Sequence, residues 1–464
     1  MVDLTSIFHY LTVIILLLSP AAFATDLRSL WSNEFAIQPL KKGSINSFVF
    51  GVSWEGGSPR NENETNLFSL GSVKKIITAA TALRELGSDY QFSNEFCGDL
   101  DTAQGILFSP SFSVSGDPTW AHPSYGENLS SRILKVINEL KKQKVKRVVG
   151  EIKINLLRPA VAQFHRPEEW KKEWLLECYA ALPTSVSLNG NCAELAIYSR
   201  KNLGWATPGV STPIENRLTI SKVNSIVITP QLNEFGRIQK YVVSGGFASP
   251  ITQSVPVHEN EEWLKNIVIQ QLRSSGIFYQ ASSTKLKPSL NSVSHFYVDL
   301  SSKRLKEVLI PFLQDSINLV GDRLHIEAPE DFVTLASLLP DPMEYQNITL
   351  LDGSGLIAED KISPLTFLHI LKALKDQPYF EDLFNGLPVS GVSGTLESRM
   401  DDALLKGRVH AKTGTIDGVA NLAGYWTKVD QSLEPFVIFT DSNVSAHVAR
   451  VKIDAAVAEF ARKN

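Results

Sequence analysis

Three short polar patterns are spread along the chain, and a fold in which they act together has to join both ends of the chain. Ser72 and Lys75 open an apolar segment near the start, Ser316 and Asn318 follow a second apolar segment, and Lys412-Thr413-Gly414 lies in a β-like run near the end. The stretch between the first two patterns is long enough for one or two domains. The spacing therefore predicts one domain interrupted by a large insertion.

The regular patterns at both ends of the chain are those of an α/β domain. Residues 48–54 alternate and are rich in β-forming types, and residues 72–86 have apolar positions at helical spacing before a stop at Gly87. Nearer the end we expect helices at 305–319 and 364–376, strands at 407–414, 420–428 and 435–441, and a closing helix at 446–463.

The pattern of predicted secondary structure changes in the middle of the chain. Short β-like runs such as 106–114 and 148–154 alternate with turns, and one amphipathic helix is visible near 129–143. We expect an N-terminal signal at 1–24, two parts of one α/β domain at 25–95 and 288–464, and one or two mostly β accessory domains inserted at 96–287.

The first residues have the pattern of a secretory signal. An apolar run at 10–18 ends at Ser19-Pro20, and the small residues Ala22 and Ala24 predict cleavage after Ala24. The segment before the run has no Lys or Arg, so a buried helix or an uncleaved anchor stays open as an alternative. No later run approaches the roughly 20 apolar residues of a membrane span. We expect a periplasmic or secreted protein with no stable membrane span after signal cleavage.

Net charge and cysteine content limit which partners, metal sites and disulfides we expect. The formal net charge is −4, which gives no electrostatic reason to expect a nucleic acid partner. No Cys-x-x-Cys pair or His-Glu-x-x-His pattern supports zinc. In an exported chain two of the three cysteines can be bridged; Cys178 and Cys192 are the better pair, which leaves Cys97 free.

Ser72 and Lys75 have the spacing of a nucleophile and its base. At i and i+3 of a helix start the two side chains share one face, so the amine reaches the hydroxyl. A serine attacks only when a base takes its proton, and a lysine serves as that base only if burial or a nearby cation, such as Lys412, lowers its pKa. By itself the pattern also fits a helix cap with a solvated lysine.

The other two patterns supply proton transfer and substrate binding. We expect Ser316 to relay a proton to the leaving amine, and Asn318 to hold the substrate peptide. Lys412 and Thr413 would bind a terminal carboxylate, and Gly414 would let the substrate backbone approach the strand. The backbone amides of Ser72 and Thr415 would form the oxyanion hole.

Two features near the motifs can be explained by structure alone as well as by function. Asp352-Gly353-Ser354-Gly355 resembles a nucleophile turn or a metal loop, but it fits a structural turn that packs near the site. His410 shares a strand face with Lys412, and it is either a site residue or a packed neighbour.

The three patterns in this order are the signature of serine β-lactamases and penicillin-binding proteins. The wide gap before Ser316, together with the blocks 351–356, 394–399 and 411–424, resembles the low-molecular-mass class C penicillin-binding proteins. In the insertion, residues 115–119 and the Cys178–Cys192 segment are also similar to that family, in which such cysteines can be bridged. The resemblance implies a β-lactamase-like domain with an antiparallel sheet flanked by helices, and mostly β domains inserted into it.

The resemblance also implies an activity. A serine-type D-Ala-D-Ala carboxypeptidase or endopeptidase would act on peptidoglycan stem peptides and cross-links through an acyl-enzyme on Ser72, with β-lactams as inhibitors and neither metal nor organic cofactor. A β-lactamase and a catalytically slow peptidoglycan-binding protein are the alternatives. The oligomeric state and the balance between the two peptidase activities stay open.

The chain departs from the family at two charged positions. Asn189 stands where an aspartate is frequent, and Ile357-Ala358 replaces a Ser-Arg pair that helps bind the stem-peptide side chain in some members. We therefore expect a neutral or different side-chain pocket.

Overall fold

The computed structural model describes residues 48–54, 63–158, 164–282, 289, 292–330, 337–340, 348–416, 418–442 and 445–463. The predicted signal at 1–24 and the residues up to 47 lie outside this part of the chain.

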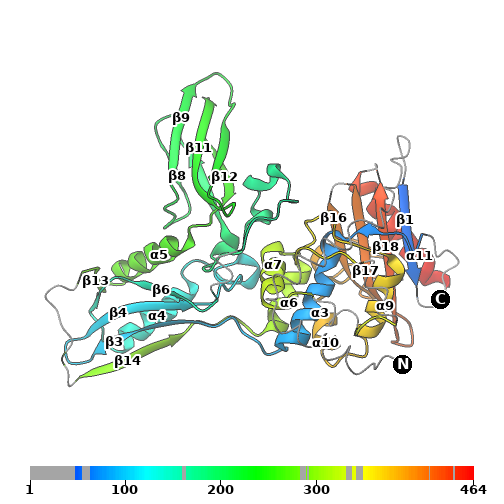
Figure 1. Ribbon diagram of the computed structural model, residues 1–464, viewed down its shortest axis with the longest axis horizontal. Coiled ribbons are helices and arrows are strands. Elements are labelled where there is room, and N and C mark those ends of the chain that lie inside the picture. Colours follow the sequence, from blue (N-terminus) through cyan, green and yellow to red (C-terminus); the bar gives the residue numbers. More distant parts are fainter. Residues whose placement is uncertain are drawn as a thin grey trace, which may run out of the picture. The chain divides into compact units, whose positions relative to one another are not determined.

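A four-stranded antiparallel sheet joins the two ends of the described chain. Its order is β1 (Phe48–Trp54), β18 (Leu433–Ser442), β17 (Val419–Thr427) and β16 (Val409–Ile416). The first strand therefore lies against the last one, as the spacing of the three patterns predicts (Figure 1). The expected α/β fold class is confirmed by this architecture and by its solved neighbours, described below.

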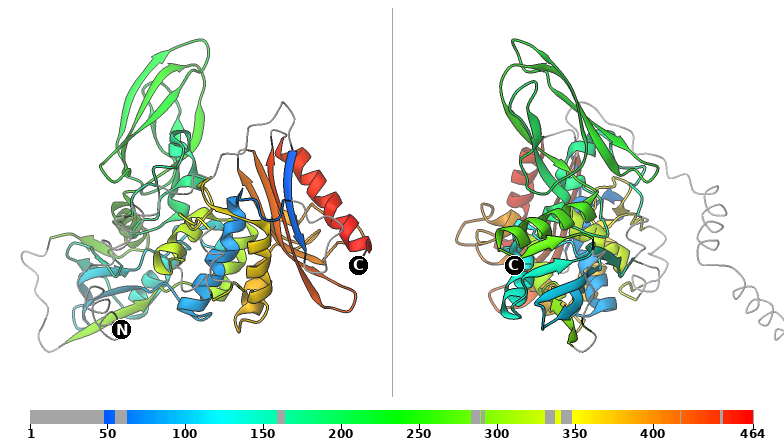
Figure 2. Two further views of the ribbon diagram at one scale, coloured as in Figure 1. Left: turned by 45° about the vertical axis from the view of Figure 1, so that its right-hand side comes forward. Right: turned by 90° about the vertical axis from the view of Figure 1, so that its left-hand side faces the viewer.

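The two faces of this sheet pack on different helices because side chains alternate along each strand. On one face, Leu422 and Ile438 pack with Ile453 and Val457 of α11 (Ala446–Lys463). The other face carries a larger core shared with five helices: α3 (Lys75–Leu86), α6 (Leu305–Gln314), α7 (Asn318–Glu327), α9 (Pro364–Leu374) and α10 (Phe380–Gly386). Figure 2 shows the red helix α11 and the blue helix α3 on opposite faces.

The helix predicted at 305–319 is broken in the structure. It consists of α6 and a second helix, α7 (Asn318–Glu327), with Ser316 between them at φ 57°. A positive φ at a serine is uncommon and reverses the chain locally. The break leaves Ser316 just before α7 and Asn318 as its first residue, and both line a pocket together with Ser72. Nearby, the short strands β2 (Phe68–Ser69) and β15 (Lys361–Ile362) pair.

The middle of the chain forms three further sheets. The largest sheet has the order β13 (Phe278–Gln280), β5 (Arg147–Val149), β4 (Ile106–Val114), β3 (Asn94–Asp101) and β14 (Val293–Asp299), and β6 (Lys153–Leu156) also pairs with β4. The second sheet has the order β10 (Val227–Leu232), β11 (Ile238–Phe247) and β9 (Ile214–Ile220). The third has the order β12 (Ile251–Pro256), β7 (Cys192–Ile197) and β8 (Leu203–Trp205). Strand β14 lies beyond position 287 of the sequence-based division, yet it pairs with β3.

Two details of this region differ from the sequence expectation. The strand expected at 148–154 is split into β5 and β6 because Gly150, at φ 111°, bends the chain. Besides the predicted helix, α4 (Ser131–Lys142), there is a second long helix, α5 (Asn260–Ser274). Trp263 and Ile267 of α5 pack in the same core as Ile133 and Ile137 of α4.

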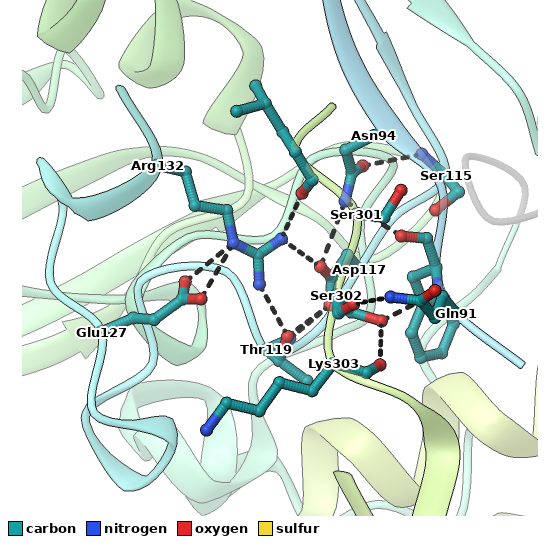
Figure 3. A network of polar contacts seen from close by, with 12 residues as sticks. Gln91, Asn94, Ser115, Asp117, Thr119, Glu127, Arg132, Ser301, Ser302 and Lys303 are labelled. Atoms are coloured by element: carbon teal, nitrogen blue, oxygen red, sulfur yellow. Dashed lines mark hydrogen bonds and ion pairs between the residues drawn. The ribbon is translucent and has the colours of Figure 1, made fainter. Parts of the chain in front are cut away.

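A buried polar network ties together the segments through which the chain enters and leaves this region. Arg132 of α4 donates to Asp117 Oδ2 at 2.5 Å, to Glu127 Oε2 at 2.9 Å and to the carbonyl of Leu300 at 3.0 Å (Figure 3). Asn94, at the start of β3, donates to the same Asp117 carboxylate. The side chains of Arg132 and Asp117 are almost fully buried, so each charge depends on the other.

Candidate active site

The hydroxyl of Ser72 and the amine of Lys75 are in hydrogen-bonding contact. Ser72 lies in the 3₁₀ turn η1 (Gly71–Lys74), Lys75 is the first residue of α3, and Lys75 Nζ is 2.8 Å from Ser72 Oγ. The same amine donates to Asn318 Oδ1 at 2.6 Å and to the carbonyl of Ser354 at 2.7 Å. Since Lys75 is 0% exposed, its amine has these three partners in place of bulk water.

This burial changes the acidity of Lys75. Loss of solvent lowers the pKa of Lys75 to about 7, with the charge of Lys74 lowering it further and those of Asp322 and Asp352 opposing the shift. Near neutral pH much of the amine is therefore unprotonated and able to accept the proton of Ser72. Lys412 is not among the charges that lower it; burial and then Lys75 push the pKa of Lys412 itself well below its usual range.

The second and third patterns meet at Ser316. Lys412 Nζ, fully buried, donates to Ser316 Oγ at 2.9 Å and to the carbonyl of Thr413 at 3.0 Å. The structure thus brings Ser72, Lys75, Ser316 and Lys412 around one cleft, in which Ser72 and Ser316 are both lining residues.

Asn318 bridges the catalytic lysine and the inserted region. Its Oδ1 accepts from Lys75, and its Nδ2 donates to the carbonyl of Tyr179 at 2.9 Å. Tyr179 lies in the short turn η5 (Cys178–Ala180), and Cys178 is joined to Cys192 by a disulfide, while Cys97 is free. Both ends of the Asn318 amide are engaged within the protein, and its contact with substrate stays a prediction.

The threonines and the glycine of strand β16 have different surroundings. Thr413 Oγ1 lies 2.9 Å from Thr395 Oγ1, and Thr413 and Thr415 line the cleft. Gly414 faces the other way: a Cβ there would lie 2.6 Å from the carbonyl oxygen of Leu70. The glycine therefore lets η1 approach β16, which is a need of the protein's own packing, and the approach of substrate at Gly414 stays a prediction.

Two further residues support the site: Asn421, which the sequence analysis did not single out, and Asp352, whose turn was expected to pack near the site. Asn421 of β17 donates to the carbonyls of Ser69 at 2.8 Å and Leu70 at 3.0 Å, just before Ser72. Asp352 accepts backbone N–H groups of its own turn, including that of Ser354 at 3.0 Å, and the turn presents the Ser354 carbonyl to Lys75. A lone asparagine in an otherwise apolar strand was the available signal for Asn421.

Two further pockets border Ser316 and Asn318, and one of them also reaches Ser72. One contains Ser72, Ser316 and Asn318 together with the aromatic side chains of Trp174 and Tyr179 from the insertion. The other is lined by polar and disulfide-bonded residues of the insertion and by the start of α7: His122, Cys178, Asn189, Cys192 and Asp315 among them.

The remaining sequence-predicted positions lie as follows. Asn189 lines the second of these pockets, Ile357 is buried and Ala358 is exposed. The His410 ring stacks on Phe384 with centroids 4.2 Å apart, which is the packed arrangement. Within the described ranges, no three His, Cys, Asp or Glu side chains are grouped so as to hold a metal ion.

Comparison with known proteins gives consistent matches over nearly the whole chain. The model of the D-Ala-D-Ala carboxypeptidase 3 (S13) family matches residues 61–463. The D-alanyl-D-alanine carboxypeptidase DacB of Haemophilus influenzae is 24% identical over 460 residues, covering 92% of this chain and 91% of that protein. The penicillin-sensitive carboxypeptidase A of Dictyostelium discoideum is 24% identical over 437 residues, covering 82% and 80%.

A solved structure shares the fold. The crystal structure of penicillin binding protein 4 from Haemophilus influenzae has a TM-score of 0.64 and 22% identity, and the match covers 86% of this chain and 91% of that one. The same protein complexed with a β-lactam has a TM-score of 0.62.

Proposed function

Since the chain belongs to the D-Ala-D-Ala carboxypeptidase 3 (S13) family, we propose that it cleaves the D-Ala-D-Ala bond of peptidoglycan stem peptides through an acyl-enzyme on Ser72. The resemblance to class C penicillin-binding proteins, expected from the motifs, is confirmed by these matches. The observation that carries the proposed mechanism is the fully buried amine of Lys75, 2.8 Å from Ser72 Oγ.

The mechanism follows from the contacts around Ser72. Lys75 accepts the hydroxyl proton as Ser72 Oγ attacks the carbonyl carbon of the penultimate D-alanine, while the amides of Ser72 and Thr415 bind the oxyanion. As the peptide C–N bond breaks, the proton that Lys75 took from Ser72 is relayed to the departing amine through Ser316, which accepts a hydrogen bond from Lys412 at 2.9 Å. Water then attacks the ester carbonyl while Lys75 takes one of its protons, and this proton returns to Ser72 Oγ as the ester C–O bond breaks and the shortened peptide leaves. Cross-links are cut by the same steps.

The test is the intact mass of the protein after incubation with benzylpenicillin, for the wild type and for Ser72→Ala, together with D-alanine release from a stem peptide. We expect a persistent adduct of one penicilloyl group on the wild type, D-alanine release, and neither with Ser72→Ala. Rapid release of penicilloate would indicate a β-lactamase. Peptidoglycan binding without D-alanine release would indicate a slow binding protein, and both outcomes would overturn the proposal.

We also propose that the protein works in the periplasm after export. The substrate lies outside the cytoplasmic membrane, and the apolar run at 10–18 with Ala22 and Ala24 fits a signal that is cleaved. In the part of the chain that the structure describes, no helix has both the length and the apolar character to cross a membrane. N-terminal sequencing of the mature protein should begin at Thr25; an unprocessed Met1 would contradict this.

The pocket of Asn189 is proposed to take a cationic stem-peptide side chain in spite of the missing aspartate. Asp315 brings a carboxylate into this pocket, and burial lowers the pKa of the neighbouring His122, so that ring is neutral at neutral pH. This proposal departs from the neutral or different pocket expected from the sequence, because Asp315 supplies a carboxylate that the sequence analysis did not consider.

Two stem peptides, one with a diamino acid and one with norleucine at the side-chain position, test this. We expect the wild type to prefer the diamino acid and Asp315→Asn to lower that preference about threefold to fivefold. Glu381→Gln, an exposed change on α10, is the control. Equal rates for both peptides with the wild type would rule the cationic pocket out.

A further inference from the structure

The turn η1 contributes one member of a buried ion pair. Lys74, the residue before Lys75, donates to Glu330 Oε1 at 2.5 Å, and neither of these two side chains is exposed to solvent. The Glu330 carboxylate also bonds Nδ1 of His325 on α7; although burial alone would raise its pKa, the charge of Lys74 and the bond to His325 hold that pKa well below its usual range. A second carboxyl near Lys74, that of Asp360, has its pKa raised well above the usual range, chiefly by burial, and so is uncharged. The counter-ion of Lys74 is therefore Glu330.

The ion pair is connected to the turn that holds the catalytic base. Lys74 Nζ also donates to Thr78 Oγ1 at 3.1 Å, and this hydroxyl lies 2.9 Å from the carbonyl oxygen of Gly353. The next carbonyl along the chain, that of Ser354, accepts from Lys75 at 2.7 Å. The two neighbouring lysines are thus bound to consecutive carbonyls of one turn, Lys74 through Thr78 and Lys75 without an intermediate.

Stability alone does not account for a lysine at position 74. A buried ion pair gains little over apolar side chains of similar volume, because both ions lose their water. A charge on Lys74 also opposes a charge on its neighbour Lys75, since like charges repel most strongly where water is excluded. The position therefore suits a residue that acts on the charge of Lys75.

Charged groups from each of the elements packed against Lys75 act on its amine. Burial lowers the pKa of Lys75 most, Asp322 of α7 and Asp352 raise it, and Lys74 lowers it. Burial and then the charge of Asp352 raise the pKa of Asp322 to about 8, so this carboxyl is largely uncharged near neutral pH. The pKa of Lys412 on β16 is itself lowered, by burial and then by Lys75. Lys74, fixed in its ion pair, is therefore the cation that remains beside the base near neutral pH.

We propose that Lys74, held as a cation by Glu330, is a positioning residue that disfavours a positive charge on Lys75 and so keeps this amine ready to accept the proton of the nucleophile. The inference rests on the proposed function and adds to it the means by which the base is kept unprotonated. A cation in this place changes the free energy of protonating Lys75 and not its contact with the nucleophile. Its removal should shift the pH at which acylation begins and leave the rate at high pH almost unchanged.

The test is the pH profile of acylation by benzylpenicillin in the double variant Lys74→Met/Glu330→Gln, which removes both charges and so leaves no unpaired buried ion. We expect the midpoint of the profile, which follows the pKa of Lys75 at about 7 in the wild type, to rise by about one pH unit. Acylation should then be about tenfold slower than in the wild type at about pH 6, and within about twofold of it at about pH 9. Lys74→Arg keeps the cation and should keep the wild-type midpoint.

A control and a second variant accompany this test. Arg132→Met with Asp117→Leu removes the buried ion pair of the insertion and should leave the midpoint unchanged, whatever its effect on stability. If Lys74→Met/Glu330→Gln does not fold, Lys74→Gln/Glu330→Gln, whose two amides can bond to each other, carries the same expectation.

An unchanged or lower midpoint in the double variant, or an equal loss of rate at every pH, would overturn the role of Lys74 and leave the ion pair with a structural part only. The wild type separates the two proposals. If it forms the penicilloyl adduct with a rate that rises toward pH 7 and the double variant has the same midpoint, only this inference fails. If the wild type forms no adduct, the proposed function fails.

Discussion

At the residue scale, the burial of Lys75 links the fold to the pH at which the protein works. The amine has lost water and gained Ser72, Asn318 and the Ser354 carbonyl as partners, and its pKa is lowered to about 7. A lysine on the surface would be protonated at that pH and unable to act as a base. The ability of Ser72 to attack is therefore set by how completely Lys75 is enclosed.

We expect the second-order rate of acylation by benzylpenicillin to rise about tenfold per pH unit below pH 7 and to level off above it. The reason is that the protonated amine, which prevails below the pKa of Lys75 at about 7, cannot take the proton of Ser72. A labelled penicillin and quenched time courses between about pH 5 and pH 9 measure this. A profile that falls with increasing pH across this range would exclude Lys75 as the base.

At the scale of elements, the turn that carries Ser72 is held from the sheet. Asn421 of β17 donates to the carbonyls of Ser69 and Leu70, and its own Oδ1 accepts from the N–H of Thr440 on β18 at 2.9 Å. Gly414 lets η1 come close to β16 on the same side. The nucleophile is thus positioned by strands from the far end of the sequence.

Asn421→Ala should slow acylation of Ser72 at least tenfold and lower the free energy of unfolding by about 1–3 kcal/mol. The change leaves buried carbonyls and the Thr440 N–H without partners. Penicillin labelling and urea unfolding measure the two effects. Asn224→Ala, which removes an asparagine that bonds Ser249 near β9 and β11, is the control and should acylate normally. Unchanged acylation in Asn421→Ala would show that the turn holds itself.

At the scale of the whole molecule, buried arginines connect the insertion to the domain that holds Ser72. Arg132 binds Asp117, and Arg323 of α7, also buried, donates to the carbonyls of Ser115 at 2.6 Å and Gly116 at 3.0 Å. The block at 115–119, seen in the sequence only as a resemblance, thereby has a physical role. It is the strip of chain that both arginines bind.

Arg132→Met should lower the free energy of unfolding by about 3–5 kcal/mol, because it leaves the Asp117 carboxylate buried without its cation. Adding Asp117→Leu should recover part of this loss, since an apolar pair removes the unpaired charge. Urea denaturation of the wild type, the single variant and the double variant provides the comparison. A double variant less stable than the single one would contradict this account.

Much of the fold could be predicted from periodicity and from the spacing of the motifs. The bounds of β1 and α11 match the expected ranges because alternation and helical spacing are local signals. The break at Ser316 could not be predicted, because it depends on a positive φ at this residue. This conformation occurs together with a tertiary hydrogen bond from Lys412. Helix α5 was missed although Trp263, Leu264, Ile267 and Val268 follow helical spacing.

The candidate site was predictable in its members but not in its geometry. The motifs indicated Ser72, Lys75, Ser316 and Lys412, and the structure places them within hydrogen-bonding reach in pairs. Which way each side chain faces depends on long-range packing, as the inward side of Gly414 shows.

The amide of Asn318 makes the base and the insertion mechanically dependent on each other. Its oxygen is committed to Lys75 and its nitrogen to the backbone of Tyr179, next to the Cys178–Cys192 bridge, so the group cannot turn over without losing both partners. A displacement of the disulfide-anchored turn at Tyr179 would therefore move the Asn318 amide and, through it, the amine of Lys75. The insertion, which its composition marks as accessory, therefore helps to position the catalytic base. Removing it would alter the chemistry as well as the shape.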